Sequence, residues 1–120
     1  MVTYIYEGDI FSLKDVSNFA HGCNCAGAMG KGIALQFKMQ YPKMYKEYKF
    51  LCQEGLFLLS DVFIYKYENG TIFNLGTQAT WKTKADLNSI EIALEKIIPA
   101  QAEFINRLNE HLNTPVKMKE

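Results

Sequence analysis

The feature that most constrains this chain is a glycine-rich segment between a strand-like and a helix-like stretch. Residues 24–32 contain three glycines in Asn-Cys-Ala-Gly-Ala-Met-Gly-Lys-Gly. So small and flexible a run favours a loop, because glycine weakens both helices and strands. Phe19–Cys23 before it predicts a buried strand, and the apolar spacing from Ile33 predicts a helix. Since ligands of α/β sheets bind beyond the carboxyl ends of strands, the loop is a candidate ligand site.

The loop also has the properties of an anion site. Gly27, Gly30 and Gly32 can adopt positive φ, and successive amides at a helix start bind anions. The sequence is not a Walker loop, because Lys31 lacks the Ser or Thr that should follow, and it is not the dinucleotide fingerprint either. Judged by these residues alone, a glycine-rich connector without a ligand is equally consistent.

The rest of the chain alternates strands and helices, which indicates an α/β fold. Val2–Tyr6 predicts a first strand, and Lys43 to about Gln53 predicts a second helix after Pro42, with Gly55 as its cap. Leu58–Tyr67 and residues 71–75 flank Asn69-Gly70, a strong hairpin signal. Asp86 or Asn88 can cap a helix that runs to about Ile98. Its predicted apolar face comprises Leu87, Ile90, Ala93, Leu94 and Ile97.

Length and charge narrow the class of protein. A chain of 120 residues predicts a single domain over residues 1–120. Its 13 basic and 13 acidic residues give no net charge, so the protein as a whole has no electrostatic attraction for nucleic acids or anionic membranes. Three cysteines form no even disulfide set, and we find neither a signal-peptide pattern nor a membrane span. We therefore expect a cytoplasmic protein.

The segment Gly22–Ala34 resembles the first ligand loop of macrodomains. The likeness is strongest to the branch with ADP-ribose 1″-phosphate phosphatases, terminal ADP-ribose hydrolases and antitoxins that reverse DNA ADP-ribosylation. It extends over roughly residues 1–98 and implies a mixed sheet flanked by helices. The other matching positions are Gly8-Asp9-Ile10, Tyr41-Pro42-Lys43, Tyr48, Cys52 and Ile72-Phe73-Asn74-Leu75.

The resemblance implies roles for individual residues. Asp9 would accept a hydrogen bond from the adenine amino group beside Ile10, and Asn24 would hold hydroxyls of the distal ribose. From the residues alone, Asp9 could instead cap a turn and Asn24 could bond its own backbone. Trp81 could stack on a base. The predicted ligand-binding set is Asp9, Ile10, Asn24, Gly27, Met29, Gly30, Lys31, Gly32, Ile33, Gly76, Thr77, Gln78 and Trp81.

Catalysis is less clearly indicated than binding. Gln78 stands where related hydrolases carry a lysine, and glutamine cannot act as a nucleophile. His21, with Asn24, is the catalytic candidate, and the alternative is a core histidine that only packs and hydrogen-bonds. His21, Cys23 and Cys25 alternate along one strand, but three such ligands rarely close a tetrahedral site, so we expect no metal. We expect no cofactor.

The end of the chain departs from the family pattern. Macrodomains usually continue past the helix near Ile98 with a last strand and a second glycine-rich loop, which residues 98–120 do not resemble. Ala100–Leu112 instead predicts an amphipathic helix that suits homo-oligomerisation or packing on its own domain. We thus expect a protein that sequesters or senses an ADP-ribose-derived signal, with a place in phage or bacterial defence. The alternative is a phosphatase or hydrolase of ADP-ribose 1″-phosphate or of ADP-ribosylated substrates, nucleic acid included.

Overall fold

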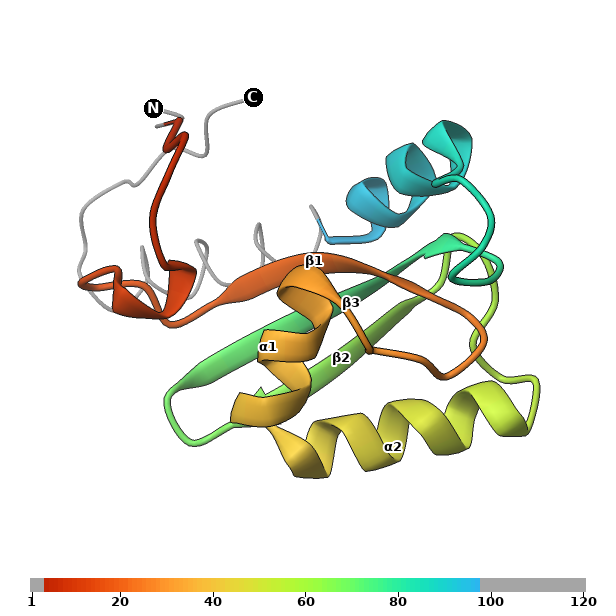
Figure 1. The fold of residues 1–120 in the computed structure, drawn as a ribbon, viewed down its shortest axis with the longest axis horizontal. Coiled ribbons are helices and arrows are strands. Elements are labelled where there is room, and N and C mark those ends of the chain that lie inside the picture. The colour runs from red at the N-terminus through yellow and green to blue at the C-terminus, as the bar shows by residue number, and fades with distance from the viewer. Residues whose placement is uncertain (1–3, 98–120) are drawn as a thin grey trace, which may run out of the picture.

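A three-stranded mixed sheet forms the centre of the computed structural model, which describes residues 4–97. The strands are β1 (Phe19–Asn24), β2 (Val62–Tyr67) and β3 (Gly70–Gln78). β3 lies in the middle, parallel to β1 and antiparallel to β2 (Figure 1). Helices flank the sheet, as predicted. Because β1 and β3 run in parallel, both end at the same edge of the sheet.

Helices cover both faces of this sheet. α1 (Gly32–Gln40) and α2 (Pro42–Gln53) follow β1. Pro42 occupies the first turn of α2, and Gly55 ends that helix with φ +69°, so both predicted boundaries are confirmed. A short 3₁₀ helix, η1 (Ile10–Ser12), precedes β1, and one more helix spans residues 87–97.

The hydrophobic core is split by the sheet. Alternate residues of β3 point to opposite faces, so Ile72 packs toward α1 and α2 while Phe73 and Leu75 pack toward the helix over 87–97. The larger cluster is Phe19, Cys23, Met29, Phe37, Met44, Tyr48, Phe57 and Ile72. The smaller cluster is Phe73, Leu75, Ala93 and Ile97.

The predicted hairpin is confirmed, although β3 runs on to Gln78, beyond the predicted end at Leu75. Tyr67 pairs with Gly70 across the turn, and a Cβ on Gly70 would lie 2.0 Å from the Ser17 carbonyl oxygen. β2 starts at Val62 rather than at Leu58. The four residues before it form a turn instead, in which the Leu58 amide donates to the Asp61 carboxylate and the Asp61 amide donates to the Leu58 carbonyl.

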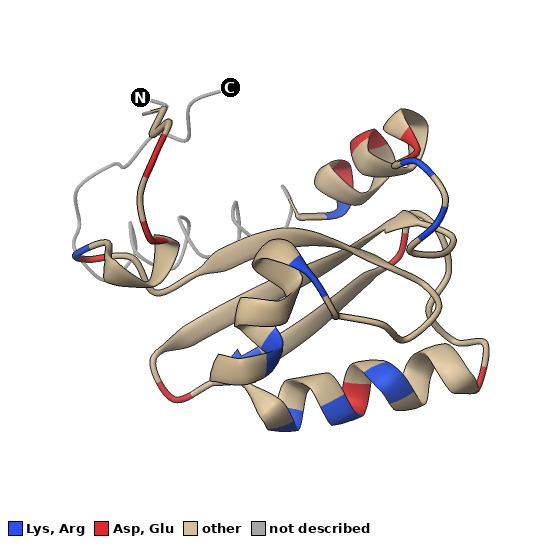
Figure 2. Ribbon diagram, in the orientation of Figure 1, with Lys and Arg blue, Asp and Glu red and all other residues tan. Residues whose placement is uncertain are grey.

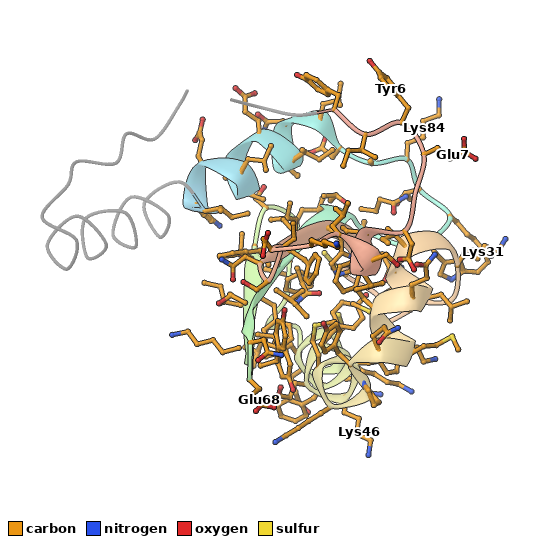
Figure 3. All side chains as sticks on the ribbon, turned by 90° about the vertical axis from the view of Figure 1, so that its left-hand side faces the viewer. Tyr6, Glu7, Lys31, Lys46, Glu68 and Lys84 are labelled. Atoms are coloured by element: carbon orange, nitrogen blue, oxygen red, sulfur yellow. The ribbon has the colours of Figure 1, made fainter. Side chains whose placement is uncertain are left out.

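Two other expectations need correction. The described part of the predicted strand Val2–Tyr6 is not a strand, and Tyr6 is 97% exposed and projects outward (Figure 3). β propensity alone stabilises no strand that lacks a partner. In the helix over 87–97, Asp86 caps the start through the Ser89 amide as predicted, but Leu87 is 81% exposed. The predictions for residues 98–120 lie outside the described residues.

Charged residues are scarce in the described strands, where Lys66 of β2 is the one example, and lie on the helices and in the loops (Figure 2). The charges of α2 are mostly basic, whereas those of the helix over 87–97 are mostly acidic. An ion pair near the latter joins Lys96 to Asp61 at 3.6 Å. Within the described part of the chain, no helix is both long and apolar enough to span a membrane.

Candidate functional site

A cavity of about 540 Å³ opens where β1 and β3 end. One wall comes from the glycine loop, which we define as residues 24–33, together with the end of β1 and the first turn of α1. The opposite wall comes from the end of β3 and from the tryptophan segment, which we define as residues 79–86. The lining residues are Gly22, Cys23, Asn24, Ala28, Gly30, Lys31, Gly32, Ile33, Ala34, Gln78 and Trp81.

Asn24 fixes the shape of the glycine loop. Its side-chain oxygen accepts the amides of Ala26 at 3.0 Å and Ala28 at 3.2 Å, and its Nδ2 donates to the Ala28 carbonyl at 2.7 Å. These bonds satisfy most of the hydrogen-bonding capacity of a side chain that is almost fully buried. The Asn24 side chain is therefore used mainly to hold the loop in shape. Of the two roles that the sequence left open, binding a ribose or bonding nearby backbone, this is the second.

The loop is also held from behind by the core. The Tyr48 hydroxyl donates to Asn24, and the Tyr45 hydroxyl donates to the Gly27 carbonyl at 3.0 Å. Met29 is 1% exposed and packs in the larger core cluster, away from the cavity. Gly27 adopts φ +84°, a conformation that an L-residue rarely accepts. Gly27 and Met29 therefore shape the loop without lining the cavity.

The first turn of α1 offers unpaired amides to the cavity. The first intrahelical bond is donated by Leu35 to the Lys31 carbonyl, and among the residues that the structure describes no side chain caps this helix. The amides of Gly32, Ile33 and Ala34 stand before that bond at the positive end of the helix dipole. Lys31 adds a positive charge and projects outward from the loop (Figure 3). This wall can therefore hold an anion.

The opposite wall is held by local hydrogen bonds. Gln78 Nε2 donates to the Thr83 carbonyl at 2.6 Å, and Thr83 bonds Thr80 at both its amide and its carbonyl. Trp81 extends from this turn with 63% of its surface exposed, and the Lys82 ammonium lies 4.9 Å from its ring. A flat aromatic face thus borders the cavity opposite the amides of α1.

The structure does not bring Asp9 or Ile10 to this cavity. The Asp9 carboxylate accepts the Phe11 amide at 2.9 Å and the Ser12 hydroxyl at 3.2 Å, so it caps η1. Ile10 packs against the larger core cluster. Both residues border a separate hollow formed by residues 5–10 and Leu13. Capping a turn is the alternative that the sequence offered for Asp9.

His21 lies in the core rather than in the cavity. Its ring stacks on Phe37 with centroids 4.2 Å apart, and its Nε2 bonds the Asn74 side-chain oxygen at 2.6 Å. Burial lowers its pKa below the ordinary histidine value, although the Asn74 bond opposes this shift. Its Nδ1 is buried and has no hydrogen-bond partner among residues 4–97. This placement matches the packing histidine that the sequence left open as the alternative to a catalytic one.

The predicted pair from β3, Gly76 and Thr77, is not among the residues that line the cavity. The Gly76 amide donates to the Asp61 carbonyl at 2.8 Å, and a Cβ there would lie 2.5 Å from the Leu58 carbonyl oxygen. Thr77 donates to the Cys23 carbonyl at 3.4 Å. Both therefore join β3 to its neighbours. The predicted residues that do line the cavity are Asn24, Gly30, Lys31, Gly32, Ile33, Gln78 and Trp81.

The described lining is poor in acid–base groups. Among the described lining residues, Lys31 alone carries a charged side chain. Burial raises the pKa of the Cys23 thiol far above its usual range, so this thiol stays protonated. Cys25 stands outside β1, which ends at Asn24. In residues 4–97 no three His, Cys, Asp or Glu side chains gather in a group able to hold a metal ion.

Two residues of this site were not predicted as functional. Tyr45 and Tyr48 belong to the apolar stripe of α2, and that stripe predicts only packing. Their spacing of three residues places both hydroxyls on the face toward the loop. The sequence holds no signal that separates a tyrosine with such a partner from a buried aromatic, because the partners are backbone groups distant in the chain.

The chain is similar to known proteins both in sequence and in structure. No protein-family model matches the chain. A DNA ADP-ribosyl glycohydrolase of Mycobacterium tuberculosis is 34% identical over 104 residues, which are 82% of this chain and 28% of that protein. An ADP-ribose 1″-phosphate phosphatase of Saccharomyces cerevisiae is 31% identical over 106 residues, 80% of this chain and 59% of that protein. The chain thus spans only part of each of these relatives.

The solved structures give the same result. The macrodomain of Mycobacterium tuberculosis DarG matches with a TM-score of 0.73 and 32% identity. The match covers 94% of this chain and 70% of that structure.

Proposed function

Because the chain belongs to the macrodomain family, we propose that it binds an ADP-ribose-like nucleotide in the cavity between the glycine loop and Trp81. The names of both curated relatives refer to an ADP-ribose group, as a DNA modification in one and as its 1″-phosphate in the other. The cavity volume lies within the range of small-molecule sites, about 300–1,000 Å³. Recognition of the nucleotide is the function that these observations support best.

The observation that carries this proposal is the uncapped start of α1 at the cavity. A diphosphate placed there would accept the amides of Gly32 and Ile33 and gain from the helix dipole. Lys31 would add charge at the rim. Trp81 offers a flat surface on which a base or sugar of the ligand could stack. Backbone amides able to bind an anion, a lysine side chain and an aromatic ring thus border the same cavity.

We further propose that the protein sequesters or senses the nucleotide rather than converting it. Turnover needs a nucleophile or an acid–base group at the reacting ribose. The described lining offers Lys31 and a protonated thiol, while His21 stacks on Phe37 in the core. A place in phage or bacterial defence would fit a protein that holds a signalling nucleotide.

Gly30→Leu is the sharpest test of binding at this cavity. A Cβ at Gly30 would meet nothing within 4 Å, and its backbone lies outside the positive-φ region, so the fold should accept a side chain. Because Gly30 lines the cavity, a leucine side chain there should take up part of its volume. We expect calorimetry to detect ADP-ribose binding to the wild-type protein and at least tenfold weaker binding to Gly30→Leu at unchanged melting temperature. Gly30→Ala is the matched control and should show a smaller loss. Undetectable binding by the wild type would refute the proposal.

The relatives' names favour one alternative, a phosphatase or hydrolase of ADP-ribose 1″-phosphate or ADP-ribosylated substrates. Prolonged incubation with ADP-ribose 1″-phosphate and with ADP-ribosylated DNA separates the two possibilities. Mass spectrometry should recover both compounds unchanged if the protein only binds. Release of phosphate or ADP-ribose that Gly30→Leu abolishes would establish turnover instead.

A further inference from the structure

The glycine loop rests on two tyrosines of α2 that lie outside the cavity. Tyr48 is fully buried, and its hydroxyl lies 2.6 Å from the Asn24 carbonyl and 2.9 Å from the Asn24 side-chain oxygen. The same side-chain oxygen accepts the amides of Ala26 and Ala28. One hydroxyl therefore ties the end of β1 and the turn after it to the middle of α2.

Tyr45 holds the loop at a second point. Its hydroxyl donates to the Gly27 carbonyl at 3.0 Å, and the Lys38 ammonium lies 4.4 Å from the centre of its ring. A Cβ at Gly27 would lie 3.5 Å from Cβ of Cys52, so the loop backbone lies directly on α2 there. The two hydroxyls thus fix the loop at its start and at its left-handed turn.

We propose that Tyr45 and Tyr48 are positioning residues that hold the glycine loop in its binding shape before any ligand arrives. This proposal rests on the nucleotide-binding function proposed above. Neither tyrosine lines the cavity, so each acts on a ligand only through the loop. A loop that is ordered in advance spares the ligand the cost of ordering it, and this saving strengthens binding. The Tyr48 hydroxyl keeps its proton for this role, because its burial strongly disfavours the charged form.

The test compares three tyrosine-to-phenylalanine variants, each lacking one hydroxyl. Tyr45→Phe and Tyr48→Phe remove the bonds to the loop. Tyr67→Phe is the matched control, because its hydroxyl donates to the Ser17 carbonyl at the opposite end of the sheet. Hydrogen exchange of the amides in residues 25–33 measures loop order without any ligand. Calorimetry with ADP-ribose measures its consequence.

We expect faster exchange in residues 25–33 for Tyr45→Phe and Tyr48→Phe, with exchange in β3 unchanged. ADP-ribose should bind each roughly three- to tenfold more weakly, the equivalent of one hydrogen bond. Tyr67→Phe should match the wild type in both measurements. If Tyr48→Phe unfolds the protein, Tyr45→Phe carries the test, since its hydroxyl is only partly buried.

Three results would overturn this role. The first is loop exchange equal to that of Tyr67→Phe. The second is faster exchange spread evenly over β1, β3 and the loop, which would indicate a general structural role. The third is weaker binding without faster exchange, which would indicate direct contact with the ligand. If the wild type binds no ADP-ribose, the proposed function fails, while the exchange data still decide whether the tyrosines order the loop.

Discussion

The two walls of the cavity are built in different ways. The glycine loop is held by side chains distant from it in sequence, with Asn24 bonded to Tyr48 and Met29 packed in the core. The tryptophan segment is held by bonds among near neighbours, such as Gln78 to Thr83, and it presents Trp81 to solvent. The glycine-loop wall is therefore part of the folded core, whereas the tryptophan segment lies on the surface and is held mainly by its own local hydrogen bonds.

This difference separates residues that maintain the shape of the cavity from residues that would only contact the ligand. A change to a glycine-loop side chain that is bonded to the core, such as Asn24, should alter stability and binding together. A change at Gly30, where added atoms meet open space, should alter binding alone. A change at Trp81 should alter binding alone. Four substitutions or conditions test the distinction, and their expected effects on stability decrease from Asn24 to Trp81.

Asn24→Ala should have the largest effect. It removes three hydrogen bonds within the loop and leaves the buried Tyr48 hydroxyl without its side-chain acceptor. We expect a loss of about 3 kcal/mol in the free energy of unfolding, measured by urea titration, and no measurable ADP-ribose binding. Asn88→Ala, on the exposed side of the helix over 87–97, is the control and should be neutral. A loss under 1 kcal/mol would mean that the loop folds without Asn24.

Gly76→Ala should come next and should contrast with Gly30→Ala. The new methyl at Gly76 would lie 2.5 Å from the Leu58 carbonyl oxygen, a backbone atom that cannot move without shifting the turn before β2. We expect a destabilisation of about 2 kcal/mol. The methyl at Gly30 meets open space and should cost less than about 0.5 kcal/mol. Thermal melting of both variants checks the pair, and equal melting temperatures would contradict it.

The features that the sequence predicted correctly are those fixed by residues near one another in the chain. The position of the glycine loop is local information: three glycines between a strand and a helix fix where the chain turns, and the loop lies there. The hairpin at Asn69-Gly70 and the caps at Asp86 and Gly55 are equally local, and all three are confirmed.

The orientation of individual side chains could not be predicted in the same way. Met29 and Gly27 belong to the loop motif but face the core, because the contacts that turn them inward come from α2. Asp9 matches the family motif, yet its carboxylate is used by its neighbours two and three residues onward. His21 alternates in phase with the buried residues of β1, a pattern that fits a core histidine as well as a catalytic one.

Acid should weaken the strand beneath the glycine loop. Burial lowers the pKa of His21 in the folded protein, so below about pH 6.5 the unfolded chain takes up a proton that the folded protein resists. The stabilisation is complete above that pH and is lost progressively as the pH falls. Urea titrations at pH 7.5 and pH 5.5 should show a lower midpoint at pH 5.5, and His21→Gln should reduce the difference. An identical difference in the variant would assign the pH dependence to other groups.

Trp81→Ala should have the smallest effect on stability. With most of its surface exposed and one exposed cation nearby, removal of the ring should change the free energy of unfolding by less than about 0.5 kcal/mol. Binding should respond differently, because stacking of a base on an aromatic ring is worth about 1–3 kcal/mol, so ADP-ribose should bind at least fivefold more weakly. Trp81 is the single tryptophan of the chain, so its fluorescence directly reports a ligand in the wild-type cavity. Gly30→Leu should abolish the fluorescence change while leaving the ring in place. Unchanged affinity in Trp81→Ala, with no fluorescence change in the wild type, would leave the glycine loop as the wall that both shapes and contacts the ligand.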